Sequence, residues 1–529
     1  MTCLPGYYIT LLPVGVRLQA SPGALLRDLL FEQGVEFPCG GQGRCRGCRV
    51  RLITGDLPVT DVQRERLTPE ELLHGWRLAC QGCVASDLTL ELRQWDAAVL
   101  TDETPMEFLP AEGLGIAVDV GTTTLVAQLL DLTDGQVLAV RTALNAQARF
   151  GADVMSRVQF AVVEQGHSML VDSIRRQVGA LIQQLLQAAR RSEQELRRVV
   201  LAGNTVMHHL FCDESLEPLA RHPFEPHNPG MRAFDPADLG WDLPGHVAVW
   251  FLPCIGGFVG SDVLAGVLAT RLHEADRLTV FIDLGTNGEI VVGHQERMLC
   301  ASTAAGPAFE GARIAQGMRA ATGAIWRVSV AGDGLHCDVL GDVEPAGICG
   351  SGLVDAVAAG LQQNWILPTG RLRTGERMLL AGEVFLTQTD IRQLQLAKAA
   401  IAAGVRILLR QWGATPTDVT RVLLAGAFGN YVDRNSARRI GLLDFPAEIV
   451  VPAGNTALLG AKIFLFTPLE RVEDLTGLSG RIQHISLSAD PDFQEIYVQE
   501  MMFPAQPLEE INPHDPLATR STSISGRCL

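Results

Sequence analysis

The pattern of hydrophobic and polar residues changes once along this chain and divides it into a short first part and a longer second part. In the first part, residues 7–12, 49–53 and 88–92 form the short runs that are typical of β-strands. Leucines on one helical face predict a helix over residues 22–34. Strands, one helix and a connecting loop predict a small β-grasp domain at residues 1–95.

Residues 96–113 show neither a helical nor a strand period and predict a linker. After it, the chain is predicted to form a strand, an Asp-Gly-Thr turn at Asp119 and a second strand. An amphipathic helix over residues 171–190 follows, and then a strand over residues 198–202 that ends in a glycine turn.

The same order of elements returns in the second half of the chain. Asp283 begins another Asp-x-Gly-Thr turn between strands, followed by a predicted helix over residues 391–409 and a strand over residues 421–425. Two such copies predict an internally duplicated α/β body of two lobes. The expected divisions are a first lobe and middle region at residues 114–275, a second lobe at residues 276–504 and a polar, disordered tail at residues 505–529.

Composition supports a folded multidomain protein and excludes several classes. The 529 residues leave room for three or four domains, and 47% of them are hydrophobic, which excludes a largely disordered chain. A formal net charge of −16 argues against a general nucleic-acid-binding protein. Lys398 and Lys462 are the only two lysines, and no Gly-Lys-Ser/Thr tripeptide occurs, so a P-loop phosphate site is excluded.

No targeting pattern stands at the start of the sequence. The longest apolar stretch, residues 247–260, is shorter than the roughly 20 residues that span a bilayer. We therefore expect a cytoplasmic protein without a membrane segment.

Four of the twelve cysteines have the spacing of an iron–sulfur site. Cys39, Cys45 and Cys48 form a C-x5-C-x2-C pattern, and Cys80 follows after a longer gap. Four thiolates are what the two irons of a [2Fe–2S] cluster require, and the glycines of the first gap let a loop wrap an inorganic core. The spacing therefore predicts a [2Fe–2S] cluster bound by these four cysteines.

A zinc site is the alternative, because Cys80 and Cys83 form a second CxxC pair. Zinc does not require the glycine-rich first gap, so we favour the cluster, with Cys80 as its fourth ligand. Residues 39–80 resemble the [2Fe–2S] ferredoxin domain, with adrenodoxin-like spacing. The arginines around the cluster loop, Arg49 and Arg51 among them, are interpreted as a solvated face rather than a docking surface for an acidic partner.

The two Asp-x-Gly-Thr turns have the chemistry of a phosphate site. Glycine lets the backbone approach an anion, successive N–H groups bind it, and threonine hydroxyls add donors. Asp119 and Asp283 are expected to hold Mg²⁺ or a water beside the phosphate, because like charges repel. An ordinary β-hairpin explains one such turn, but two of them with the glycine turn at residues 426–429 are more specific.

This pattern resembles the acetate kinase, sugar kinase, Hsp70 and actin (ASKHA) superfamily of ATPases, whose two lobes share a ribonuclease-H-like core. The resemblance implies that ATP binds between the lobes, with Asp119 and Asp283 as catalytic residues and Mg²⁺ beside them. The implied nucleotide-binding residues are Gly121, Thr122, Thr123 and Thr124 in the first turn, Gly285, Thr286 and Asn287 in the second, and Gly426 and Gly429 in the adenosine motif. In this chain the adenosine motif reads Gly-Ala-Phe-Gly, whereas two adjacent glycines are commoner in the superfamily. The resemblance therefore implies phosphate binding more firmly than it implies which nucleotide binds.

Other residues allow two interpretations each. Ser261 and Ser351 begin predicted helices and serve either as simple caps or as part of anion-binding helix ends. Cys349 is a candidate nucleophile without a histidine partner in view. Residues 207–209, Met-His-His, offer metal or haem ligands, but a helix is the favoured interpretation.

Over residues 7–504 the chain resembles the reductive activators of corrinoid-dependent enzymes, in which a ferredoxin-like domain, a linker and an ASKHA body follow in this order. Residues 201–210 and 302–311 carry the resemblance beyond the motifs. It implies ATP-dependent reduction of a corrinoid protein from Co(II) to Co(I) with an electron from the cluster. The implied partners are a methyltransferase or a corrinoid iron–sulfur protein and a low-potential electron donor, with no nucleic acid or membrane. The oligomeric state is open, with a homodimer as one option.

Rival functions use the same residues. A plain [2Fe–2S] electron carrier would not need Asp119 and Asp283, and a small-molecule kinase of the ASKHA type would not need an attached cluster. A 2-hydroxyacyl-CoA dehydratase activator has the same ATPase fold but holds a [4Fe–4S] cluster between subunits, unlike the separate four-cysteine loop here.

Overall fold

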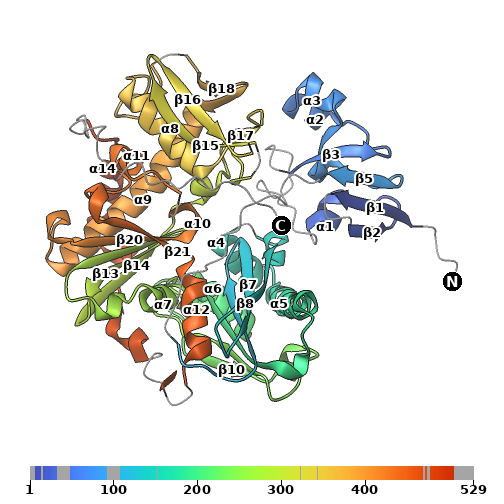
Figure 1. The fold of residues 1–529 in the computed structure, drawn as a ribbon. Helices are drawn as coiled ribbons and strands as arrows, with labels where there is room; N and C mark the ends of the chain where they lie inside the picture. Colours follow the sequence, from blue (N-terminus) through green and yellow to red (C-terminus); the bar gives the residue numbers. More distant parts are fainter. Residues whose placement is uncertain are drawn as a thin grey trace.

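The computed structural model describes residues 6–12, 16–31, 48–91, 108–151, 153–321, 323–341, 343–373, 375–429, 431–468, 471–472 and 477–505. A small sheet domain stands beside a larger α/β body that contains two six-stranded sheets (Figure 1). The predicted fold class is confirmed. The predicted ligands Cys39 and Cys45, most of the linker and nearly all of the tail lie outside the described residues.

The N-terminal domain is built on a five-stranded sheet in the order β2-β1-β5-β3-β4. Its strands are β1 (Tyr7–Leu12), β2 (Val16–Ala20), β3 (Arg49–Thr54), β4 (Trp76–Leu78) and β5 (Leu88–Glu91). The helices are α1 (Leu26–Phe31), α2 (Asp61–Arg66) and α3 (Pro69–Leu73). The three predicted strands are confirmed, whereas α1 begins four residues later than predicted. Leucines and valines of the sheet and α1 form a separate hydrophobic core.

The first large sheet has the strand order β10-β11-β9-β6-β7-β8. Its strands are β6 (Leu114–Val120), β7 (Thr124–Asp131), β8 (Val137–Leu144), β9 (Leu196–Gly203), β10 (Arg232–Phe234) and β11 (Ala248–Phe251). The helices of this lobe are α4 (Val154–Val162), α5 (His167–Ala189), α6 (Thr205–Cys212) and α7 (Ser261–Ala269). The helix predicted at residues 171–190 is confirmed as α5, which begins one turn earlier.

The second large sheet has the order β21-β20-β12-β13-β14-β22. Its strands are β12 (Thr279–Leu284), β13 (Gly288–His294), β14 (Arg297–Thr303), β20 (Arg421–Ala425), β21 (Val450–Gly454) and β22 (Ile482–His484). The helices are α8 (Gly350–Gln362), α9 (Gln388–Trp412), α10 (Gly426–Gly429), α11 (Arg434–Arg439), α12 (Thr456–Phe466) and α14 (Phe493–Glu500). Smaller strands complete this lobe: β15 (Ala324–Ala331), β16 (Gly334–Val339), β17 (Gly347–Ile348), β18 (Arg377–Ala381) and β19 (Val384–Thr387).

The two large sheets repeat the same pairing scheme, which confirms the predicted duplication. In each, three antiparallel strands form a meander whose first strand runs parallel to a later strand. Asp119 of β6 lies opposite Ala202 of β9, and Asp283 of β12 lies opposite Ala425 of β20. The two aspartates therefore occupy equivalent positions in the two lobes.

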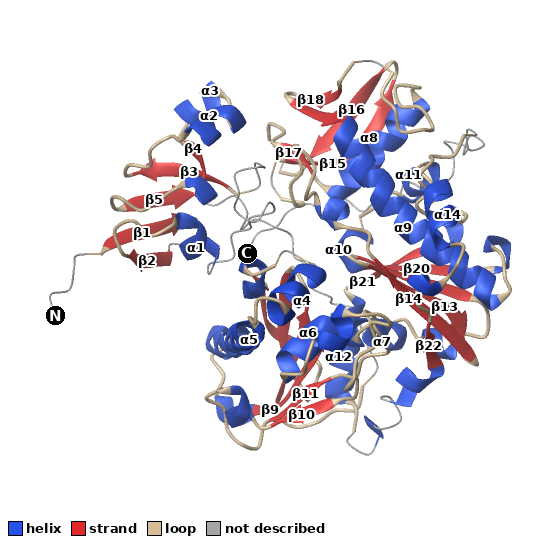
Figure 2. Cartoon of the chain, turned by 180° about the vertical axis from the view of Figure 1, so that it is seen from behind, coloured by secondary structure: helices blue, strands red, loops and turns tan. Residues whose placement is uncertain are grey.

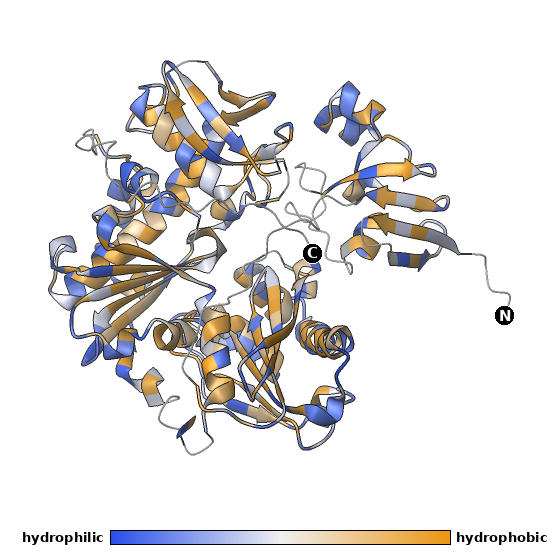
Figure 3. Cartoon of the chain, viewed as in Figure 1, coloured by the Kyte–Doolittle hydropathy of each residue, from blue (hydrophilic) through white to orange (hydrophobic). Residues whose placement is uncertain are grey.

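Helices α7 and α12 join the lobes. They share one hydrophobic core with residues from both large sheets, including Ala117 of β6 and Phe281 of β12. Gly460 of α12 allows close approach, because a Cβ there would lie within 2.4 Å of the Ala265 backbone in α7. Figures 2 and 3 show these helices and the apolar strands that they cover. This packing brings the N-terminal ends of α7 and α12 to the region of the two aspartates.

Residues 108–113, which the sequence assigns to the linker, pack on the body. The Phe108 and Phe466 rings lie 4.4 Å apart, and the Ala111 N–H donates to the Leu132 carbonyl. Among the described residues, no helix is long and apolar enough to cross a membrane.

Candidate functional site

The two predicted turns lie between the lobes and are joined there by other polar residues. Asn455, which caps the N-terminus of α12, donates from Nδ2 to Asp119 Oδ2 at 3.1 Å. Asp262 lies in the first turn of α7, and its Oδ1 accepts the Val263 N–H at 2.8 Å. The sequence therefore folds two strand ends and two helix N-termini into one polar site between the lobes.

Burial and mutual repulsion perturb the carboxylates of this site. Burial raises the pKa of Asp119 to about 7, with the Asn455 hydrogen bond lowering it and the charge of Asp283 raising it. Burial raises the pKa of Asp283 to about 6. The pKa values of Asp262 and Glu289 are also raised, by burial first and then by neighbouring aspartates. A site with several carboxylates in low-dielectric surroundings favours a cation or a proton.

Glu310 connects the two turns. It ends the 3₁₀ helix at Pro307–Glu310, and its carboxylate accepts hydrogen bonds from Thr123 Oγ1 at 3.3 Å and from Thr286 Oγ1. Burial raises the pKa of Glu310, and the two threonine hydroxyls oppose that shift. One carboxylate is therefore bonded to the first turn and to the second turn at once.

The first turn is supported by side chains from four other elements. Asn145 Nδ2 donates to the Gly121 carbonyl, and Asn204 Nδ2 donates to Thr122 Oγ1, both at 2.8 Å. The buried Arg157 guanidinium donates to the Thr122 carbonyl. Arg319, from the second lobe, donates to Thr124 Oγ1 at 3.0 Å. These bonds fix the turn and place a guanidinium beside it, which is a group suited to binding phosphate.

The predicted glycine turn at residues 426–429 forms α10, a single helical turn directly after β20. Gly426 has φ +83°, and a Cβ there would lie 2.7 Å from Asp283 Oδ1 and from the Leu284 carbonyl oxygen. The Gly426 backbone therefore lies against the second turn, in a position that only glycine fills without displacing it.

Replacing Gly426 by alanine tests this close approach. Gly426→Ala is expected to displace Asp283 and to weaken ATP binding by tenfold or more, on the order of 1.4 kcal/mol. Isothermal titration calorimetry with ATP measures the change. Gly413→Ala is the matched control, since Gly413 has φ +87° but no atom within 4 Å of its Cβ position. Equal ATP affinity in both variants would contradict the prediction that Gly426 lies at a nucleotide site.

The raised pKa of Asp119 predicts a pH-dependent stability in EDTA. A carboxyl whose pKa rises on folding binds its proton more tightly in the folded state, so stability is lost as the pH rises from about 4 toward 7. Asp119→Asn removes this loss and should flatten the fall in melting temperature between pH 5 and pH 8. At pH 8 we expect Asp119→Asn to have a free energy of unfolding higher than that of wild type by on the order of 2 kcal/mol. This value is smaller than the full pKa shift implies, because Asp119 is only half-buried and solvent screens its charge. Melting temperatures that fall by the same amount between pH 5 and pH 8 in wild type and variant would contradict the expectation.

Carboxylate oxygens are the ligands that Mg²⁺ prefers, and Asp119 and Asp283 supply them from the two lobes. Within the part of the chain that is described, no three Asp, Glu, His or Cys side chains converge to form a complete protein-ligated metal site. Mg²⁺ commonly keeps several waters and uses only one or two carboxylates together with phosphate oxygens. The donor set therefore fits a hydrated Mg²⁺ held with a nucleotide.

The described part of the cysteine site brings Cys48 and Cys80 together. Arg49 pairs with Leu78 across β3 and β4, and the Ala79 N–H donates to the Cys48 carbonyl at 3.0 Å. Cys48 is therefore beside the turn that carries Cys80. Gln81 Nε2 lies 3.6 Å from Cys80 Sγ, a donor suited to a thiolate. Cys83 is exposed, and its backbone bridges to Leu25.

The remaining predicted residues have structural positions. Gly260, not Ser261, caps α7, because Ser261 Oγ is bonded to the Gly203 backbone across the sheet. Cys349 rather than Ser351 is the N-cap of α8, and burial raises the pKa of the Cys349 thiol, which disfavours a nucleophilic thiolate. The favoured helix at residues 207–209 is confirmed as part of α6, with both histidines buried.

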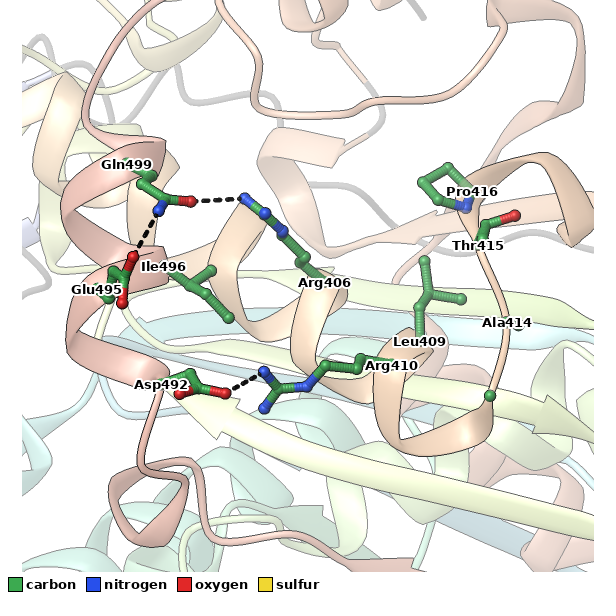
Figure 4. Close-up of a pocket in the computed structure, with 11 residues that line it drawn as sticks. Arg406, Leu409, Arg410, Ala414, Thr415, Pro416, Asp492, Glu495, Ile496 and Gln499 are labelled. Carbon is green, nitrogen blue, oxygen red and sulfur yellow. Dashed lines mark hydrogen bonds and ion pairs between the residues drawn. The ribbon is translucent and has the colours of Figure 1, made fainter.

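A surface pocket of about 560 Å³ lies between α9 and α14, away from the two turns (Figure 4). Residues 406–416 and 492–499 supply its lining. Arg406 bonds to Gln499 at 3.2 Å and Arg410 to Asp492 at 2.6 Å, so these arginines fasten α14 to α9.

Comparison with known proteins shows which family combines these parts. Residues 9–85 match the family described as "2Fe-2S iron-sulfur cluster binding domain". Residues 114–275 match the family "RACo middle region". Residues 277–514 match the family "C-terminal domain of RACo the ASKHA domain". Corrinoid activation enzyme RamQ of Eubacterium limosum is 35% identical over 419 residues, 74% of this chain and 70% of RamQ. The chain belongs to the RACo family.

Two further relatives agree with this membership of the RACo family. The [Co(II) methylated amine-specific corrinoid protein] reductase of Methanosarcina barkeri is 27% identical over 75% of this chain and 78% of its own length. The solved structure of a reductive activator for corrinoid,iron-sulfur protein is 27% identical, covers 94% of this chain and 98% of its own, and has a TM-score of 0.68. The similarity therefore extends through the cluster domain and both lobes.

Sequence reasoning missed several residues of the site in this RACo-family chain. Asp262 follows Ser261, and Glu310 lies in residues 302–311; the sequence analysis names both places without giving these carboxylates a role. Asn455 and Arg319 carry no sequence signal, because each reaches the first lobe from a distant part of the chain.

Proposed function

We propose that this chain is an ATP-dependent reductive activator, which transfers one electron from a [2Fe–2S] cluster to a corrinoid protein and returns its cobalt from Co(II) to Co(I). One observation carries the proposal: a cysteine-bearing 2Fe-2S domain and a duplicated body with two Asp-x-Gly-Thr turns stand in one RACo-family chain. A plain carrier would not explain the turns, and a small-molecule kinase would not explain the cysteines.

We assign the cluster to Cys39, Cys45, Cys48 and Cys80. The approach of Cys48 to the Cys80 turn supports a shared site, and the exposed position of Cys83 favours Cys80 as the fourth ligand. The bound cluster would supply reversible one-electron transfer at low potential, about −400 mV for a plant-type centre. The core beneath β3 and β4 fixes the backbone of the two described ligands.

We assign ATP and Mg²⁺ to the site between the lobes. Backbone N–H groups and hydroxyls of Thr122–Thr124, Gly285, Thr286 and Asn287 would bind phosphates, and Arg319 would offset their charge. Asp119 and Asp283 would bind Mg²⁺, through its water shell or directly, and orient the attacking water. Gly426 and Gly429 would flank the adenosine. The raised pKa values of the two aspartates support a site that needs a cation to become fully ionised.

The need for ATP follows from the direction of electron flow. Reduction of Co(II) to Co(I) requires a very reducing donor, and each 59 mV of unfavourable difference costs about a factor of ten for one electron. ATP can shift that equilibrium only through a state of the protein that binds the corrinoid partner differently. We propose that nucleotide-dependent closure of the two lobes changes affinity for the partner and that hydrolysis releases it.

The partner is a corrinoid protein in this proposal, either a methyltransferase or a corrinoid iron–sulfur protein, and a low-potential donor reloads the cluster. The relatives' names support this class of partner. A reducing cytoplasm suits a chain with twelve cysteines and a low-potential cluster.

The test is an anaerobic assay with purified reduced protein and a Co(II) corrinoid carrier. We expect the Co(I) absorbance to appear after addition of MgATP and to remain absent with MgADP. No absorbance change with any Co(II) carrier of the two proposed classes would contradict the function.

A further inference from the structure

Arg49 links the cluster domain to the ATPase body. Its Nη2 donates to the Ala346 carbonyl at 3.0 Å, although the two residues are 297 positions apart. Figures 1 and 2 both show β17, which follows Ala346, as a part of the body that faces β3 and the cluster domain. The sequence interpretation of Arg49 as part of a solvated face is therefore wrong: its side chain is only 16% exposed.

The Arg49 guanidinium is held in place from within its own domain. Nη1 donates to Glu71 Oε1 at 2.8 Å, and the guanidinium carbon lies 5.9 Å from the centre of the Trp76 ring. Glu71 is itself fixed, because Glu71 and Thr68 form the capping box of α3. One side of the guanidinium is thus oriented by Glu71, and the other is presented to the body. Arg49 also directly follows the proposed cluster ligand Cys48.

The acceptor of this bond leads back to the proposed nucleotide site. Ala346 precedes β17, and Cys349, one residue after β17, caps α8. Gly350 packs on the backbone of Phe309, so closely that a Cβ at Gly350 would overlap it. Phe309 is the neighbour of Glu310, whose carboxylate accepts hydrogen bonds from both Asp-x-Gly-Thr turns. A continuous series of packed backbone segments therefore joins Arg49 to the proposed phosphate site.

We propose that Arg49 docks the cluster domain on the β17 segment, and that nucleotide phosphate at the two turns weakens this docking by competing with Glu310 for Thr123 and Thr286. This inference rests on the proposed function, for which it supplies the regulation. Phosphate oxygens accept from the same hydroxyls, and the Glu310 carboxylate is repelled by the phosphate charge. Displacement of Glu310 moves the 3₁₀ helix on which Gly350 packs, and so moves the Ala346 carbonyl. The cluster domain is then free to approach the corrinoid partner.

Coupling of this kind requires an element with two arrangements that both sites influence. Here that element is Glu310 with its 3₁₀ helix, bonded to the turns or displaced from them. By reciprocity, weaker docking must strengthen nucleotide binding by the same factor.

The experiment is small-angle X-ray scattering on the full chain with its cluster, for wild type and Arg49→Gln, each with and without Mg²⁺ and AMP-PNP. Loss of a hydrogen bond from a charged donor should lower the equilibrium constant for docking about tenfold. Arg49→Gln should therefore have a larger radius of gyration than wild type without nucleotide. The difference should vanish when Mg²⁺ and AMP-PNP are added, because nucleotide releases the wild-type domain.

Two other variants serve as checks. Glu71→Gln keeps a residue that can form the capping box but removes the charge that orients Arg49. It should therefore increase the radius of gyration without nucleotide, as Arg49→Gln does. Unlike Arg49→Gln, it does not change a residue next to Cys48 in the sequence. Arg51→Gln is the matched control on β3, since Arg51 pairs with the exposed Glu91 and should leave the radius unchanged. Visible spectra verify the cluster in every sample.

Equal radii for Arg49→Gln and wild type without nucleotide would overturn the docking contact. A difference that persists unchanged with AMP-PNP would overturn its control by nucleotide. Calorimetry provides a second readout: Arg49→Gln should bind AMP-PNP more tightly, and unchanged affinity counts against the coupling. Formation of Co(I) by wild type is measured separately. The scattering result can therefore contradict the docking contact while Co(I) formation still supports the proposed function, and a lack of Co(I) can contradict the function while the docking contact stands.

Discussion

Asp283→Asn is expected to lower ATP hydrolysis and ATP-driven Co(I) formation by a factor of about 100 or more while leaving the cluster intact. Asp283 stands at the end of β12 beside Gly426, at the position that Asp119 occupies in the other lobe. The amide keeps the size of the side chain but cannot bind Mg²⁺ as a carboxylate or orient water as strongly. Removal of one preorganised electrostatic group, an oxyanion-hole donor, costs about 2.7–4 kcal/mol in another enzyme, and we expect an effect of that order here. Phosphate release and Co(I) absorbance measure the two effects.

Asp276→Asn is the control for this experiment. Asp276 is exposed, lies in the loop just before β12, and is outside the site, so its loss of charge should change neither rate. Full-rate electron transfer to cobalt by Asp283→Asn would contradict the proposal and favour a plain electron carrier. ATP turnover that survives only with a small phosphate acceptor would favour the kinase instead.

Cys80→Ser is expected to remove the [2Fe–2S] signal completely and electron transfer with it. A serine hydroxyl is a poor replacement for a thiolate on iron, and Cys80 lies in the turn beside Cys48. The ATPase body has its own hydrophobic cores, so nucleotide binding should persist in this variant. Visible absorption and EPR of the reduced protein report the cluster, and calorimetry reports the nucleotide.

Cys83→Ser is the matched control, because Cys83 is an exposed residue three positions away. It should retain the full cluster spectrum and normal electron transfer. The reverse outcome, with Cys83 required and Cys80 dispensable, would overturn the ligand assignment. One zinc ion per chain with no iron in anaerobically purified protein would restore the zinc interpretation.

The fold was predictable where the signal is local. The duplication follows from two Asp-x-Gly-Thr turns between apolar strands, and the structure places Asp119 and Asp283 in equivalent registers. Of the two alternatives for Ser261 and Ser351, the cap is wrong, because the decisive contacts are distant. Ser261 Oγ is bonded to the backbone of Gly203, 58 residues away, and Ser351 Oγ donates to the Trp326 carbonyl. Propensity alone cannot anticipate such tertiary bonds.

The site was predictable only for its motif residues. Asn455 reaches Asp119 across 336 residues, and Glu310 is bonded to turns that lie in different lobes. Both contacts join the two lobes, and no short pattern in the sequence encodes them. Arg49 was misread for the same reason, since its partner in the body belongs to another domain.

A single-turnover experiment that follows cluster oxidation and cobalt reduction together tests the central claim most directly. Reduced protein is mixed anaerobically with a Co(II) corrinoid carrier, and MgATP is added while the cluster and Co(I) absorbances are recorded. We expect one Co(I) to form for each cluster oxidised, and only after MgATP is added. Co(I) formation at the same rate without MgATP, or cluster oxidation without Co(I), would contradict it.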